Sequence, residues 1–254
     1  MELFSLQDKN AVVIGASRGI GKELCLTLAE AGANVVPVSR SLEKVGETAA
    51  EVQKHGVKAV PISADVTSKT EVEKVKRRAL EELGDIDILV NCQGINIKKW
   101  ALELPEEDWN EVIDINLNSV FMTCKAFGRH MVERKQGKII NIASMTSYVG
   151  IYRSSAYAAS KGGIVQLTKV LAMEWAQDNV NVNCIAPGFF RTELTAPVFN
   201  DEVAYNRIIS RTPMGRAGEV KDLSGALIYL ASAASDYVTG ISLPVDGGFL
   251  AYGI

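Results

Sequence analysis

Three residues in the second half of the chain have the types and the spacing for moving a proton to or from a carbonyl oxygen: Ser144, Tyr157 and Lys161. Tyr157 and Lys161 are four residues apart, so they share one face of any helix that contains both. The pKa of a free tyrosine is about 10, and a neighbouring ammonium group lowers it by favouring the phenolate. We therefore expect Tyr157 to donate a proton to a forming alkoxide, or to accept one from an alcohol.

Ser144 adds a hydrogen-bond donor to this pair. It follows the apolar segment 137–143, which is predicted to be a strand, and ligands of open α/β sheets bind beyond the carboxyl ends of the strands. Its hydroxyl can donate to a substrate carbonyl oxygen from that position. A lone tyrosine and lysine at this spacing are usually only neighbours on a helix surface. The preceding serine and a glycine-rich segment upstream favour the catalytic interpretation.

The glycine-rich segment lies between a predicted strand, 10–15, and a predicted helix, 20–31. Residues 15–19, "GASRG", match G-x-S-x-G, in which Ser17 would be the nucleophile of a serine hydrolase. Gly15, Gly19 and Gly21 also match a turn that binds a dinucleotide pyrophosphate at the N-terminus of the following helix. The two interpretations demand different residues elsewhere in the chain.

The two histidines favour the dinucleotide. A hydrolase needs a histidine after a late strand, whereas His55 lies in a polar helix end and His130 in an apparently exposed amphipathic helix end. The phosphate turn alone needs Gly21, because a Cβ there would obstruct the packing of the helix or the approach of the pyrophosphate. We therefore predict dinucleotide binding, with a glycine-rich turn that binds no ligand as the alternative.

Ser39 and Arg40 indicate which dinucleotide is bound. An NAD site places a carboxylate on the ribose hydroxyls at the end of the second strand, and this chain has none there. The planar guanidinium of Arg40 can pair with a 2′-phosphate, and Arg18 adds a second positive charge nearby. We predict NADP(H) as the cofactor. The alternative is that Arg40 is a solvated loop residue.

Apolar runs alternate with helical patterns along the whole chain. This alternation predicts an α/β fold: a single-domain Rossmann fold over residues 1–254, with a doubly wound parallel sheet of about seven strands and helices on both faces. The expected strands are 10–15, 34–39, 58–63, 87–91, 137–143, 181–187 and 242–247. The expected helices are 20–31, 42–55, 69–83, 106–134, 155–178 and 219–233. Residues 188–218 show no clear strand and are expected to be a substrate-binding loop, with 189–211 as its lid.

The composition excludes several classes of partner. The net charge of −3 and a pI near 5.6 argue against nucleic acid, and no apolar run approaches the roughly 20 residues that span a bilayer. The N-terminus does not resemble a signal peptide, so a cytoplasmic protein is expected. The four cysteines form no C-x-x-C pair and are expected to be small buried thiols, with no metal site.

Seven segments, in order, resemble the short-chain dehydrogenase/reductase superfamily over almost the whole chain. They are "GASRGIG", "ADV" with Asp65, "NCQG" at 91–94, Asn116 in "DINLNSV", Ser144, Tyr157 with Lys161, and "APGFFRT" at 186–192. The resemblance implies strand order 3-2-1-4-5-6-7 and a homotetramer. One departure is "NCQG", in which Cys92 and Gln93 replace the usual Asn-Ala and put the close packing of this turn on the cofactor in question.

The resemblance also implies residue roles. Asn116, Ser144, Tyr157 and Lys161 would form the catalytic tetrad, in which Asn116 holds a water. Lys161 would also bind the nicotinamide ribose, Asp65 the adenine and Thr192 the nicotinamide amide, while Asn91 would stabilise the central strand. The implied cofactor-binding residues are Gly15, Ser17, Arg18, Gly19, Ile20, Gly21, Ser39, Arg40, Asp65, Val66, Asn91, Gly94, Tyr157, Lys161, Pro187, Gly188 and Thr192.

Within the superfamily the chain is most similar to gluconate 5-dehydrogenases and 2-deoxy-gluconate 3-dehydrogenases. That similarity implies oxidation and reduction of a sugar acid by an NADP(H)-dependent enzyme. A carboxylate substrate needs a cationic partner, for which Lys98, Lys99 and Arg153 are candidates, with Trp100 as an apolar wall. The alternatives are a carbonyl or 3-oxoacyl-thioester reductase and, from another class, a non-catalytic cofactor sensor.

Overall fold

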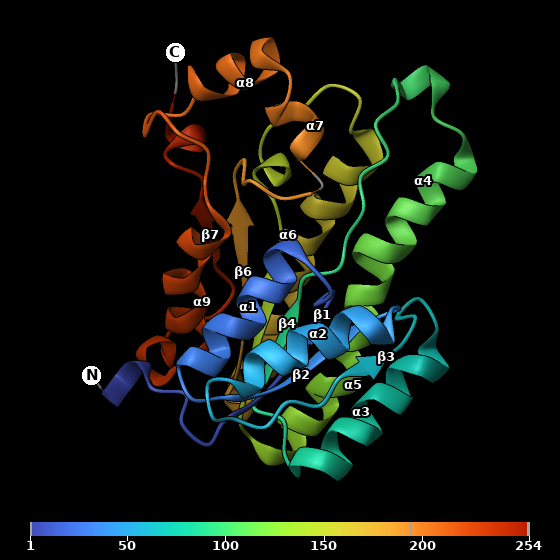
Figure 1. The fold of residues 1–254 in the computed structure, drawn as a ribbon. Helices are drawn as coiled ribbons and strands as arrows, with labels where there is room; N and C mark the ends of the chain where they lie inside the picture. The colour runs from blue at the N-terminus through green and yellow to red at the C-terminus, as the bar shows by residue number, and fades with distance from the viewer. Residues whose placement is uncertain (1, 194, 253–254) are drawn as a thin grey trace.

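The computed structural model describes residues 2–193 and 195–252. Its centre is a seven-stranded parallel sheet in the order β3-β2-β1-β4-β5-β6-β7, which confirms the predicted fold class (Figure 1). The strands are β1 (Asn10–Ile14), β2 (Asn34–Ser39), β3 (Ile62–Ser63), β4 (Ile88–Asn91), β5 (Gly137–Ile142), β6 (Val180–Pro187) and β7 (Ser242–Val245).

Helices cover both faces of this sheet. They are α1 (Gly19–Glu30), α2 (Leu42–Gln53), α3 (Lys69–Leu83), α4 (Glu106–Ile113), α5 (Ser119–Arg134), α6 (Ser155–Trp175), α7 (Ala196–Phe199), α8 (Glu202–Ile209) and α9 (Ser224–Ala231). Apolar side chains of α1, α2 and α9 form one core with one face of the sheet, and those of α3, α5 and α6 form a second core with the other face.

Strand β1 shows why the strands are continuous apolar runs. Its side chains alternate between the two faces, so Ala11 and Val13 pack toward α1, whereas Val12 and Ile14 pack toward α5. All four are buried, because helices cover both faces. Among the described residues, no helix has the length and apolar composition needed to cross a membrane.

Three predicted elements differ from the structure. The expected strand 58–63 contributes only Ile62–Ser63 and an isolated bridge from Ala59 to Val35, because Pro61 has no N–H to donate to a neighbouring strand. The expected helix 106–134 is interrupted by a π-helix, Asp114–Asn118. The expected loop 188–218 contains α7 and α8, which stand at the carboxyl end of the sheet (Figure 1, orange).

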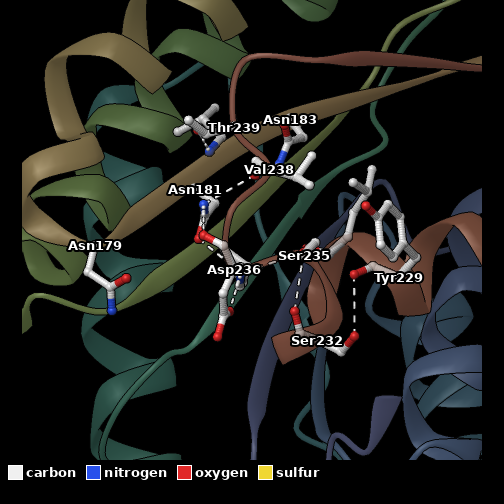
Figure 2. Close-up of polar contacts among 12 residues, drawn as sticks. Asn179, Asn181, Asn183, Tyr229, Ser232, Ser235, Asp236, Val238 and Thr239 are labelled. Atoms are coloured by element: carbon white, nitrogen blue, oxygen red, sulfur yellow. Dashed lines mark hydrogen bonds and ion pairs between the residues drawn. The ribbon is translucent and has the colours of Figure 1, made fainter. Parts of the chain in front are cut away.

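Side-chain amides of β6 hold the segment that leads into the edge strand β7 (Figure 2). The Nδ2 atoms of Asn181 and Asn183 donate to the carbonyl of Val238 at 3.1 and 2.9 Å, and the N–H of Ile241 donates to Asn183 Oδ1. Both asparagines are buried, and a buried amide is stable only when it is hydrogen-bonded. These contacts set the path of the segment that leads into β7, and so the position of the chain end that follows β7.

Candidate active site

A cavity of about 1110 Å³ lies at the carboxyl end of the central strands. It is bordered by the glycine turn after β1, the ends of β2 and β5, the first turns of α6 and the segment after β6. Every predicted cofactor residue except Asn91 lines it, as does Ser144. Sequence positions up to 177 residues apart therefore meet in one site, as the parallel strand order requires.

The glycine turn has the shape of a phosphate cradle. Gly15 has a φ of +82°, and a Cβ on it would lie 2.7 Å from the backbone nitrogen of Gln93. A Cβ on Gly21 would lie 2.1 Å from the carbonyl oxygen of Gly15. Both positions need glycine, so that α1 can begin against the strand with its N-terminal N–H groups facing the cavity. The turn fits a dinucleotide pyrophosphate.

Tyr157, Ser144 and Lys161 converge on the same cavity, but their electrostatics differ from the prediction. Burial raises the pKa of Tyr157 above its ordinary value, and the hydrogen bond with Ser144 lowers it by less. The Nζ atom of Lys161 lies 5.8 Å from the centre of the Tyr157 ring. The prediction that a neighbouring ammonium lowers the tyrosine pKa is therefore wrong for this geometry, because desolvation is the larger effect.

Lys161 is held away from the tyrosine by the backbone of β5. Its Nζ donates to the carbonyl of Ile142 at 2.6 Å, and the residue is only 4% exposed. Burial lowers the pKa of Lys161 to about 8. The amine is thus mostly charged at neutral pH and loses its proton about one pH unit higher.

Asn116 lies behind the cavity rather than in its lining. It is fully buried in the π-helix, where its Oδ1 accepts the N–H of Ile95 at 2.8 Å. Its Nδ2 donates to the carbonyl of Ile95 at 2.9 Å and to Ser160 Oγ at 3.1 Å. Asn116 therefore ties the loop after β4 to α6, through residues that lie next to Gly94 and next to Lys161 in the sequence.

Buried hydrogen bonds hold the "NCQG" turn against β5 and α5. Asn91 Nδ2 donates to Asn141 Oδ1 at 2.9 Å, and Thr123 Oγ1 donates to Asn91 Oδ1 at 2.7 Å, so Asn91 joins β4, β5 and α5. Gln93 is buried and donates to Ser119 Oγ at 3.0 Å. The larger Gln93 side chain thus points to α5, and the backbone from Cys92 to Gly94 still lines the cavity.

The other end of the cavity is cationic. Arg18, Arg40 and Lys44 line it, together with Asp65. Hydrogen bonds from Thr67 lower the pKa of Asp65, and Arg40 lowers it further. Sequence reasoning missed Lys44, although it lies in the first turn of the helix that follows Arg40 and so near the same site.

The three predicted carboxylate partners are not in the cavity lining, contrary to expectation. Lys99 Nζ forms an ion pair with Asp108 at 2.5 Å, and Arg153 donates to the carbonyl of Lys98 at 3.2 Å. Arg153 also has a φ of +63°, a left-handed backbone conformation that is uncommon for a residue other than glycine. Trp100 packs against Tyr152, with ring centres 6.0 Å apart, and half of it is exposed. These contacts join the loop after β4 to the loop before α6.

One wall of the cavity was not predicted from the sequence. It is formed by one face of α4 and the start of the π-helix, and its residues are Glu107, Asn110, Glu111, Asp114 and Ile115. Their spacing of three and four residues is the signal that they share a helix face.

The hydrolase alternative fails on the position of the histidines. Neither His55 nor His130 lines the cavity that contains Ser17. His130 is not in an exposed helix end, as its sequence suggested, since its side chain is only 18% exposed. Its Nε2 accepts the N–H of Ile86 at 3.4 Å, at the opposite end of the sheet. Ser17 therefore has no histidine beside it in this cavity, as a serine hydrolase needs.

A doubly wound sheet, a phosphate cradle and a buried tyrosine at one cavity define a dinucleotide-dependent oxidoreductase. Comparison with known proteins gives the same class. A family model described as short chain dehydrogenase matches residues 9–203. The chain belongs to the short-chain dehydrogenase family.

The relatives are similar over their full length. The 5-keto-D-gluconate 5-reductase of Escherichia coli (strain K12) is 41% identical over 249 residues, which are 98% of each chain. The 2-dehydro-3-deoxy-D-gluconate 5-dehydrogenase of Formosa agariphila is 44% identical over 99% of this chain and 96% of its own. A crystal structure of a gluconate 5-dehydrogenase from Burkholderia cenocepacia J2315, in complex with NADP and tartrate, is 39% identical with a TM-score of 0.95 over 98% of both chains.

Proposed function

We propose that this protein is an NADP(H)-dependent oxidoreductase that interconverts a keto sugar acid and the corresponding secondary alcohol. The observation that carries the proposal is the single cavity, which has a cationic end at Arg18, Arg40 and Lys44 and a proton donor at Tyr157. The names of the three relatives reported above refer to gluconate or its keto derivatives, which supports a sugar acid.

The cofactor has a place for each of its parts. We propose that the pyrophosphate lies on Gly15, Gly19 and the N–H of Ile20, and the 2′-phosphate on the cationic end. The adenine would lie by Asp65 and Val66. The nicotinamide would lie near Pro187, Gly188 and Thr192, with Lys161 on its ribose. When bound, the cofactor supplies or accepts a hydride.

The chain itself handles the proton. Because burial raises the pKa of Tyr157, the phenol stays protonated at neutral pH and is suited to donate its proton to the oxygen of a ketone. Ser144 is hydrogen-bonded to Tyr157 and can donate to that same oxygen. Lys161 contributes a positive charge below pH 8, and Asn116 fixes the loop behind Gly94.

The test is a hydride-transfer assay over matched substrates. We expect NADPH oxidation with 5-keto-gluconate or a related keto acid to exceed that with neutral diketones or acetoacetyl thioesters in kcat/KM. A preference for the neutral ketones would contradict the sugar-acid assignment and leave the oxidoreductase assignment intact. No turnover with any of them, despite NADPH binding, would favour a cofactor sensor.

A general carbonyl reductase is the second candidate. It is favoured by one observation: Lys98, Lys99 and Arg153, the expected carboxylate partners, do not line the cavity. Residues 189–211, which we propose as the substrate lid, carry Arg191, Arg207 and Arg211. Arg191 is paired with Glu219, and the guanidinium carbon of Arg211 lies 5.3 Å from the ring centre of Phe249. The same substrate panel separates this candidate from the first.

We also propose that the chain forms a homotetramer. The helices α4, α5 and α6 expose large apolar side chains, among them Trp109, Phe121, Val170 and Met173, which is 81% exposed. Exposed apolar side chains that lie close together are typical of surfaces that associate. Sedimentation equilibrium should give four times the chain mass of 27.5 kDa, and Met173→Glu should lower it. A mass of one chain for the wild type would contradict this assembly.

A further inference from the structure

We propose that Glu193 is a specificity-determining residue, which weakens the binding of 2′-phosphorylated cofactors by competing for Arg18. Nothing in the sequence singles out Glu193, which simply follows Thr192 in the segment after β6. The inference rests on the proposed NADP(H) site and deepens it, because it concerns how tightly the 2′-phosphate is held.

The competition follows from an ion pair that crosses the cavity. Arg18 Nη1 donates to Glu193 Oε2 at 2.7 Å, although the two residues are 175 positions apart. Arg18 is the N-cap of α1 in the glycine turn, and both side chains line the cavity. The two backbones also approach, since a Cβ on Gly19 would lie 3.7 Å from Thr192 Cβ. The ion pair therefore joins the glycine turn to the start of the proposed lid.

A 2′-phosphate on Arg18 would meet this carboxylate. Two anions on one guanidinium repel each other, so the phosphate must displace Glu193 or bind a cation whose charge is already offset. The other two cations of this end differ from Arg18. Among residues 2–193 and 195–252, Arg40 and Lys44 form no ion pair. Arg18 is thus, within the described residues, the one of these three cations that is held in an ion pair.

The proposed lid has an independent anchor, which makes Glu193 testable. Arg191 pairs with Glu219 at 3.3 Å, and its guanidinium carbon lies 5.1 Å from the ring centre of Phe199 and 5.5 Å from that of Tyr205. The ring contacts join Arg191 to α7 and α8, and the ion pair with Glu219 joins Arg191 to the chain outside the proposed lid. Neutralising Glu193 therefore frees Arg18 without removing the packing of the lid.

The experiment measures the affinity of the full chain for 2′,5′-ADP and 5′-AMP by calorimetry. The two probes differ only in the 2′-phosphate. For Glu193→Gln we expect the Kd of 2′,5′-ADP to fall about two- to fivefold at low salt, as expected for an exposed ion pair, and that of 5′-AMP to stay unchanged. The gain should shrink as ionic strength rises. Glu202→Gln, the same change in the first turn of α8, is the matched control and should alter neither Kd.

The Arg18→Met background completes the cycle. There, Glu193→Gln should give no further gain for 2′,5′-ADP. The inference is overturned if Glu193→Gln leaves both affinities unchanged, improves both alike, or still improves 2′,5′-ADP binding without Arg18. If the wild type binds both probes equally, the NADP(H) site itself is misassigned, and the inference fails with it.

Discussion

Lys161 Nζ donates to the carbonyl of Ile142 at 2.6 Å, while it lies 5.8 Å from the centre of the Tyr157 ring. Lys161 is thus attached to the end of β5, and it also lies near Tyr157, four residues earlier on α6. Its charge is taken out of water and compensated by one carbonyl, which explains why the pKa of Lys161 falls to about 8.

Lys161 should cost stability at neutral pH. Its pKa of about 8 in the fold lies below the ordinary 10.5, so between these values the unfolded chain binds more protons and stability rises with pH. The difference corresponds to about 3 kcal/mol. Lys161→Met should therefore be more stable than the wild type by up to this amount near pH 7, less about 1 kcal/mol for the lost hydrogen bond. Urea unfolding at several pH values measures both.

The pH dependence is the decisive part of that test. The advantage of Lys161→Met should shrink as pH rises from 8 toward 10.5. Lys169→Met, which removes an exposed lysine of the same helix, is the matched control. A constant difference for Lys161→Met would mean that folding does not lower the pKa of Lys161, contrary to the value of about 8.

Tyr157→Phe should lose turnover and keep cofactor binding. The ring still fills its place, but the proton donor is gone, which lowers kcat by about 10²–10⁴-fold. Absorbance of NADPH gives turnover, and fluorescence titration gives the dinucleotide Kd. Retention of more than a few per cent of the wild-type activity would remove Tyr157 from the role of acid.

Arg40→Ala should change cofactor selectivity. The loss of charge-assisted hydrogen bonds to the 2′-phosphate costs about 1.5–3 kcal/mol each, or roughly 10- to 150-fold in the KM for NADPH. The KM for NADH should change little, because NADH has no 2′-phosphate. Steady-state kinetics with both cofactors decide the point. Equal effects on the two would show that Arg40 does not contact the phosphate.

Gly21→Ala should damage the cradle. The new Cβ would lie 2.1 Å from the Gly15 carbonyl oxygen, so α1 must shift, at a cost of about 1–3 kcal/mol or more. Gly46→Ala is the matched control. That glycine lies in α2 with no atom within 4 Å of the added Cβ, and the change should stabilise the protein by about 1 kcal/mol. Thermal unfolding compares them, and equal melting temperatures would contradict the close approach.

Arg153→Met should affect acidic and neutral substrates alike. Its side chain donates to the carbonyl of Lys98 and does not line the cavity. Its loss should therefore loosen the two loops and affect every substrate to the same extent. We expect kcat/KM to fall by a similar factor for a keto acid and a diketone. A selective loss of the acid, by about 1.5–3 kcal/mol, would restore Arg153 as the carboxylate partner.

The sequence by itself determined the features that depend on a residue and its near neighbours. Strands β1 and β2 are read from continuous apolar runs, and the helices expected over 42–55 and 69–83 begin where α2 and α3 begin, each after a serine that caps it, Ser41 or Ser68. The glycine turn is equally local, because no other residue type allows its backbone path. Alternation of these elements then leaves few sheet topologies, and the observed order is the expected one.

The tertiary structure decided what depends on residues far apart in the chain. The packing of two loops places the Arg153 side chain on the carbonyl of Lys98. Glu193, 175 positions away in the sequence, holds Arg18 in an ion pair. The sign of the Tyr157 pKa shift belongs here too. Spacing shows that Lys161 shares its helix face, but desolvation depends on every element around the pair, and its effect is larger.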